Sequence, residues 1–253
     1  MATNHEADAE ADALADAVDT ETGARGAVYA LAARTFTEPD EDLYAALADG
    51  SLDDEFAALV DRTGLDVAPP DLTVDDDRDT LAARYNDLFV VGYSEVVDGT
   101  DGTVHSEGPP VSLYESAYRS EVSWNDVNLD LARAYEYFGV EVDQDERRHH
   151  DHVRLELEFA GYLCRVAAAA PTVDAAVDVE GARRARLDFH DRHLSVLVSG
   201  LREALDDEPG TSIYGRLARF LDAFSSADVD DLDDRLDVGA GRTTADEAGG
   251  EGA

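Results

Sequence analysis

The residues best suited to chemistry lie in one short stretch, ERRHHDHVRLELEF, which runs from Glu146 to Phe159. Its first seven residues contain three histidines, two arginines and two acids, and an amphipathic helical pattern follows. Imidazole and carboxylate groups bind metals, transfer protons and pair with cations. Three interpretations therefore compete: a metal site, a catalytic pair, or the polar rim of a surface that binds another protein.

The spacing of metal-binding side chains is incomplete. Glu146 and His149 form one E-x-x-H pair, the spacing that aims two ligands inward in di-metal helical bundles. Such a bundle needs two of these pairs and further glutamates, and the sequence contains no HExxH or CxxC motif. We expect no metal and no cofactor. A metal-binding bundle or enzyme stays open as an alternative, and its further ligands would be His152, Glu156, His190 and His193.

Motifs for nucleophilic and phosphate chemistry are missing from the sequence. It has no G-x-S-x-G motif, and because it has no lysine it cannot form a lysine-containing phosphate loop. Asp151 and His152 are sequence neighbours, and neighbours on a helix point about 100° apart, so they are not a ready-made catalytic pair. The single cysteine, Cys164, lies in a helical apolar stripe, which predicts a buried thiol. The sequence does not favour an enzyme.

The charge balance is far outside the usual range. The chain has 58 acids against 20 bases, all of them arginine, which gives a formal charge of −38 at pH 7. In molar salt such repulsion is screened within about 3 Å, so we interpret the acidity as adaptation to a salt-filled cytoplasm. So negative a protein is not expected to bind nucleic acid.

Targeting segments are not apparent in the sequence. The N-terminal stretch lacks the basic and apolar regions of an export signal, and no run of about 18 apolar residues occurs. A single cysteine fits a reducing compartment. The sequence therefore predicts a cytoplasmic protein without a membrane-inserted segment.

Helical periodicity dominates residues 23–225, which predicts an all-α, single-domain bundle of about nine helices. Residues 1–22 and 226–253 are acidic and nearly free of aromatic side chains, so we expect two disordered arms. Helices are expected at SLYESAYRSEV, at VNLDLARAYEYFG, from residue 145 to 170, from about 173 to 205, and from 211.

The longest stretch without helical period runs from Tyr93 to Pro110, which predicts a loop of functional length. Aromatic and apolar residues gather on both sides of it. Such residues are typical of a core, but their position also suits the floor of a peptide-binding groove. They are Tyr85, Leu88, Phe89, Tyr114, Tyr118 and Trp124.

Several segments, taken in order, resemble the TorD/DmsD family of redox-enzyme maturation chaperones, whose relatives assist respiratory nitrate reductases. They are RYNDLFVVG, PPVSLYESAYRS, RHHDHVRLELEFAGYL, FHDRHLSVLVSGLREAL and IYGRLARFLDAF. The similarity runs from about Tyr85 to Phe224. One departure concerns a Glu-Pro-x-Asp-His motif of the family, because this chain has Arg148-His149 in place of Glu-Pro.

The resemblance implies a chaperone, monomeric or dimeric, that binds the twin-arginine signal peptide and the body of a molybdopterin oxidoreductase. It would hold a DMSO, TMAO or nitrate reductase until the cofactor is inserted, and so delay export. Carboxylates beside an apolar groove would suit a peptide with two arginines and an apolar stretch. A helical scaffold of an unrelated complex stays open as a second alternative. The resemblance implies that Tyr85, Leu88 and Phe89 line the peptide groove. Tyr114, Ser116 and Tyr118 would form its adjoining wall, and Asp151 and His152 its polar rim.

Overall fold

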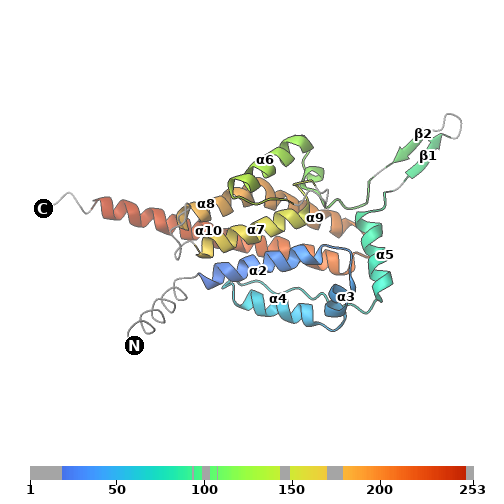
Figure 1. Ribbon diagram of the computed structural model, residues 1–253, viewed down its shortest axis with the longest axis horizontal. Coiled ribbons are helices and arrows are strands. Elements are labelled where there is room, and N and C mark those ends of the chain that lie inside the picture. The colour runs from blue at the N-terminus through green and yellow to red at the C-terminus, as the bar shows by residue number, and fades with distance from the viewer. Residues whose placement is uncertain are drawn as a thin grey trace.

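Helices form the body of the molecule in the computed structural model (Figure 1), which confirms the predicted all-α class. The structure describes residues 19–92, 94–98, 103–106, 108–142, 149–169 and 179–248. The helices of the N-terminal half are α2 (Thr20–Thr35), α3 (Glu41–Ala48), α4 (Ser51–Asp61) and α5 (Arg78–Phe89). A short 3-10 helix η1 (Glu115–Tyr118) then precedes α6 (Trp124–Tyr137), α7 (Val153–Ala169) and α8 (Val179–Phe189). A π-helical turn η3 (His190–Leu194) continues α8 into α9 (Ser195–Asp207), and α10 (Ser212–Ala248) follows.

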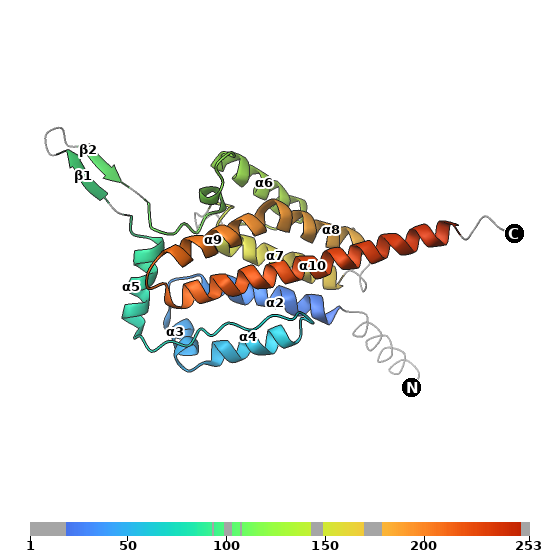
Figure 2. The same ribbon diagram turned by 180° about the vertical axis from the view of Figure 1, so that it is seen from behind.

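The centre of the fold is the pair of helices α2 and α7, which lie side by side in both views (Figures 1 and 2). Gly26 of α2 faces Gly161 of α7, and the missing side chains let the two backbones approach closely. Cys164 also lies at this contact and is buried, as predicted. Burial raises the pKa of its thiol to about 12, so it stays protonated at neutral pH.

The C-terminal helix α10 extends past residue 226, where the sequence placed the start of an acidic tail. Figure 2 shows α10 running along α9 and α8. Asp228 is buried and accepts hydrogen bonds from Arg25 of α2 at 3.1 Å and from Arg186 of α8 at 2.7 Å. Asp228 can be buried on α10 because two buried arginines neutralise it, although an acid in this acidic stretch was expected to be exposed to solvent.

The first described helix, α2, begins at Thr20. The side chain of Asp19 accepts a hydrogen bond from the backbone N–H of Thr22 at 3.0 Å, which caps α2 at Thr20. Residues 1–18 lie outside the described part of the chain.

The predicted loop from Tyr93 to Pro110 contains a β-hairpin instead. Strands β1 (Ser94–Asp98) and β2 (Thr103–Ser106) are antiparallel and extend away from the helical body beyond α5 (Figures 1 and 2). The prediction of an irregular loop was wrong for these strands, because β-branched valine and threonine residues favour extended backbone.

Two predicted helices are shorter than the sequence suggested. The segment SLYESAYRSEV forms only the 3-10 helix η1, and α7 begins at Val153. Residues 145–148 of the second predicted helix lie outside the described part of the chain. The backbone N–H of Val153 donates to the carbonyl of Leu113 at 2.8 Å, so the start of α7 is bonded to a distant segment. None of the helices in the described ranges combines the length and apolar character needed to cross a membrane.

Candidate functional site

Asp151, predicted to lie on a polar rim, is buried at the junction of η1, α6 and α7. One carboxylate oxygen accepts from the side-chain amide of Asn128 at 2.9 Å, and the other accepts from the backbone N–H of Ser116 at 3.1 Å. Its carbonyl accepts from the N–H of Glu115 at 2.9 Å. With 1% exposure and these donors, Asp151 holds three elements together and does not present a carboxylate to solvent.

His152 is also buried, and it lies beside Tyr114. The two residues form an isolated β-bridge, and their rings meet edge to face with centroids 5.1 Å apart. His149 contacts both Tyr114 and Trp124 through its ring, and Trp124 is half exposed. The predicted polar rim is thus wrong as a solvent-facing feature, and an exposed aromatic cluster of Tyr114, His149 and Trp124 adjoins it.

The residues predicted to line a groove before the loop belong to the core. Tyr85, Leu88 and Phe89 are each less than a tenth exposed. The rings of Tyr85 and Phe89 pack on Tyr214 of α10, with centroids 5.8 and 5.1 Å away. The backbone carbonyl of Leu88 accepts a hydrogen bond from the backbone N–H of Val111. This bond joins α5 to the segment that follows the hairpin. Tyr85, Leu88 and Phe89 thus lie where such residues are typically found, in the hydrophobic core.

The wall residues after the loop lie nearer the surface. Tyr114 and Ser116 are part-exposed, and Tyr118 packs on Gly200, where a Cβ would lie 2.4 Å from its ring. The Tyr118 hydroxyl donates to the carbonyl of Ser112 at 2.5 Å. The structure therefore brings the wall residues together with Asp151 and separates them from the core group around Tyr85.

The histidines of the alternative metal site are dispersed. His149 and His152 lie against Tyr114, whereas His190 and His193 belong to the π-helical turn η3. Among the described residues, no group of three histidine, cysteine or acidic side chains could hold a metal ion. Glu146 lies outside the described part of the chain.

A buried group of charged side chains links η1, α7 and η3. His193 contacts Glu115 through Nδ1 at 3.0 Å and Asp130 of α6 through Nε2 at 3.1 Å. Glu115 is fully buried and also pairs with Arg119. Glu156 is fully buried as well, and burial, followed by the charges of Glu115 and Asp151, raises its pKa well above the usual value.

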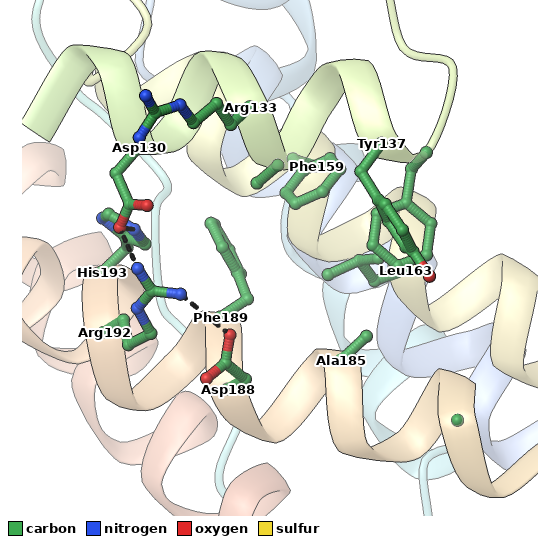
Figure 3. Close-up of a pocket in the computed structure, with 13 residues that line it drawn as sticks. Asp130, Arg133, Tyr137, Phe159, Leu163, Ala185, Asp188, Phe189, Arg192 and His193 are labelled. Carbon is green, nitrogen blue, oxygen red and sulfur yellow. Dashed lines mark hydrogen bonds and ion pairs between the residues drawn. The ribbon is translucent and has the colours of Figure 1, made fainter.

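This charged group borders a cavity of about 480 Å³ between α6, α7 and α8 (Figure 3). Phe159 and Leu163 of α7 and Phe189 of α8 form its apolar floor. Tyr137, the most exposed of the large apolar side chains in the described part of the chain, stands over one end. Asp130, Asp188, Arg192 and His193 lie at the other end.

A second hollow of about 480 Å³ continues along α6 and shares a wall with the first. Val122 and Leu129, both about half exposed, line it from α6 and its N-terminal approach. The residues common to the two hollows are Asp130, Arg133, Arg192 and His193. We call the two hollows together the α6 groove. The spacing of Asp130, Arg133 and Tyr137 along one helix face is the sequence signal that would have indicated it.

Comparison with known proteins finds similarity along most of the chain. A family model described as the nitrate reductase delta subunit matches residues 49–198. The chain is 30% identical over 178 residues to the selenate reductase assembly chaperone protein of Thauera selenatis, which covers 70% of this chain and 75% of the relative. It is 32% identical over 178 residues, with the same coverage, to the chlorate reductase assembly chaperone protein of Ideonella dechloratans. The perchlorate reductase assembly chaperone protein of Dechloromonas aromatica (strain RCB) is 25% identical over 209 residues, which cover 83% of this chain and 90% of the relative.

Proposed function

Because the chain belongs to the nitrate reductase delta subunit family of redox-enzyme maturation chaperones, we propose that it assembles a molybdopterin-containing oxidoreductase. The family membership confirms the resemblance noted in the sequence. In this proposal the protein acts in the cytoplasm and by binding rather than catalysis. It holds the twin-arginine signal peptide and the body of its client until the cofactor has been inserted. Relatives described as assembly chaperones of selenate, chlorate and perchlorate reductases support a reductase client.

The observation that carries the peptide-binding part of this proposal is the α6 groove. It combines an aromatic floor with carboxylates at one end, and a twin-arginine signal combines guanidinium groups with an apolar stretch. Helix α6 has 14 residues, which makes it about 21 Å long. An extended peptide of six or seven residues has about the same length. Size and chemistry both support a short peptide segment as the occupant.

The residues inferred from the family resemblance take two roles in this proposal. Tyr114, Ser116 and Tyr118 are part-exposed and contact the client directly. Asp151 and His152 act from the interior, because they hold η1 and α6 in register with the start of α7. The core group of Tyr85, Leu88 and Phe89 supports the same segment through α5.

Calorimetry in molar potassium chloride tests the proposal with signal peptides of reductases encoded in the same genome. Tyr137→Ala should weaken binding about tenfold or more, since burying a large apolar side chain contributes roughly 1.5–3 kcal/mol. Tyr137 is 78% exposed, so its replacement should leave the melting temperature unchanged.

Val91→Ala is the matched control, because Val91 is an exposed apolar residue after α5 and lies outside the α6 groove. It should bind like the wild type. If no cognate signal peptide and no mature client binds the wild-type protein or a variant of the α6 groove, the peptide-binding proposal fails.

A further inference from the structure

Arg192 bridges two carboxylates across the α6 groove (Figure 3). Its guanidinium pairs with Asp130 of α6 and donates to Asp188 of α8 at 3.3 Å. The arginine itself belongs to the π-helical turn η3, so one side chain connects both walls at the end of the aromatic floor. The structure thus contains a guanidinium bound between two carboxylates next to an apolar cavity.

We propose that Arg192 occupies the binding site of an arginine of the client. When the signal peptide binds, the peptide's arginine displaces Arg192 from Asp130 and Asp188. The inference rests on the proposed function and adds the position of one peptide guanidinium. It also adds a competition inside the chaperone, because the free protein occupies its own arginine site. The apolar residues that follow the arginine in the peptide then lie over Phe159 and Phe189.

The choice of these two carboxylates follows from accessibility. Asp188 and Asp130 keep 66% and 35% of their side-chain surface exposed. Asp151 and Glu115 are almost completely buried and already bonded. An arginine from outside would have to break a buried network to reach them, which is strongly unfavourable. Asp126 and Asp191 also line the groove, but it is Asp130 and Asp188 that hold a guanidinium between them. An exchange there replaces one exposed pair by another.

Displacing Arg192 would not leave an unpaired charge buried in the protein. Its side chain is 52% exposed, and exposed ion pairs contribute little to stability. After its departure Asp130 retains the contact with Nε2 of His193 at 3.1 Å. Asp188 is exposed to water. The ion pairs of Arg192 are therefore weak enough for a peptide arginine to displace them. They also occupy the carboxylates that such an arginine would bind, so Arg192 competes with it.

The test compares Arg192→Gln with Arg219→Gln. Arg219 of α10 carries the same charge and is also a half-exposed, ion-paired arginine, bonded to Asp206, but it lies outside the α6 groove. The probes are a synthetic peptide with an Arg-Arg pair before an apolar run and its Lys-Lys counterpart, measured by calorimetry in molar potassium chloride. High salt suppresses the general effect of removing one positive charge. Circular dichroism and melting curves establish that each variant is folded.

Arg192→Gln should bind the Arg-Arg peptide about two- to fivefold more tightly than the wild type, because the lost competitor is an exposed ion pair. Arg219→Gln should bind like the wild type. Asp188→Asn should bind about threefold or more weakly, whereas Glu180→Gln, the same charge change elsewhere on α8, should have no effect. The Lys-Lys peptide should bind more weakly to every form, since an ammonium group does not reproduce the guanidinium fork.

The outcomes separate this inference from the function on which it rests. Normal peptide binding that Arg192→Gln does not strengthen overturns the displacement and leaves the chaperone function standing. Equal strengthening by Arg219→Gln also overturns it, because charge alone would then explain the gain. Binding by Arg192→Gln when the wild type shows none supports the inference. A lack of binding by every form overturns both.

Discussion

Gly26 of α2 and Gly161 of α7 face each other so closely that a Cβ on either would lie 2.8 Å from the carbonyl oxygen of the other. Gly161→Ala should therefore force the two central helices apart and lower the free energy of unfolding by about 1–3 kcal/mol. Urea unfolding in molar salt measures the change.

Gly23→Ala is the control for this prediction. Gly23 is also on α2, but its added Cβ would meet the Cβ of Ala168 at 3.9 Å, an ordinary contact. Because alanine favours helix, this variant should match the wild type or gain up to about 1 kcal/mol. Equal losses in both variants would contradict the close approach of α2 and α7.

The buried carboxyl of Glu156 should make stability fall as pH rises. Its pKa is raised in the folded state, by burial first and then by Glu115 and Asp151, so the folded protein binds this proton more tightly than the unfolded chain. The loss begins above the pKa of the unfolded chain, near 4.5, and is complete above the folded pKa. Glu156→Gln removes the titrating group and should become progressively more stable than the wild type with increasing pH.

Urea unfolding of both proteins at a series of pH values tests this prediction. The difference between them isolates Glu156 from the other acids, which titrate in both. A constant difference across the pH range would show that Glu156 does not titrate in the folded protein as expected.

Asp151→Ala should destabilise the fold rather than only weaken binding. The substitution leaves the N–H of Ser116 and the amide of Asn128 without their buried acceptor, at a cost of about 2–3 kcal/mol. Asp207→Ala, which removes an exposed acid at the end of α9, should have almost no effect. Equal melting temperatures for wild type and Asp151→Ala would refute the role of Asp151 at the junction.

The formal charge of −38 should make the fold depend on salt. Dialysis to roughly 0.01 M salt lengthens the Debye screening length to about 30 Å, so acids on opposite faces repel one another. Far-UV circular dichroism should lose helical signal and recover it when potassium chloride is restored. A spectrum that stays native at low salt would contradict the interpretation of the acidic surface as adaptation to molar salt.

The sequence predicted the helical class and the main helices because these depend on local periodicity. The burial of Asp151 could not be predicted in the same way, since its partners Asn128 and Ser116 lie 23 and 35 residues away. The bridge between Arg192 and Asp130 spans 62 positions. Asp151 and His152 read as part of a surface cluster in the sequence but lie in the interior, whereas their neighbour His149 is exposed.

The family resemblance indicated the correct family, but five of the candidate residues that it implied are buried: Tyr85, Leu88, Phe89, Asp151 and His152. An aromatic stripe such as Tyr85 to Phe89 reads the same whether it lines a groove or fills a core. Only the packing of Tyr214 against it decides for the core. The spacing of Asp130, Arg133 and Tyr137 marks one face of α6, but the α6 groove also depends on how α6, α7 and α8 pack together.

Cells that lack this protein provide the decisive experiment for the proposed assembly role, with the activity and molybdenum content of the proposed client reductase as the measurement. We expect the reductase to accumulate without its cofactor and with little activity, and to be restored by the wild-type chain in trans and only partly by Tyr137→Ala. A reductase with full cofactor content and full activity in the absence of this protein would contradict the claim that it is an assembly chaperone.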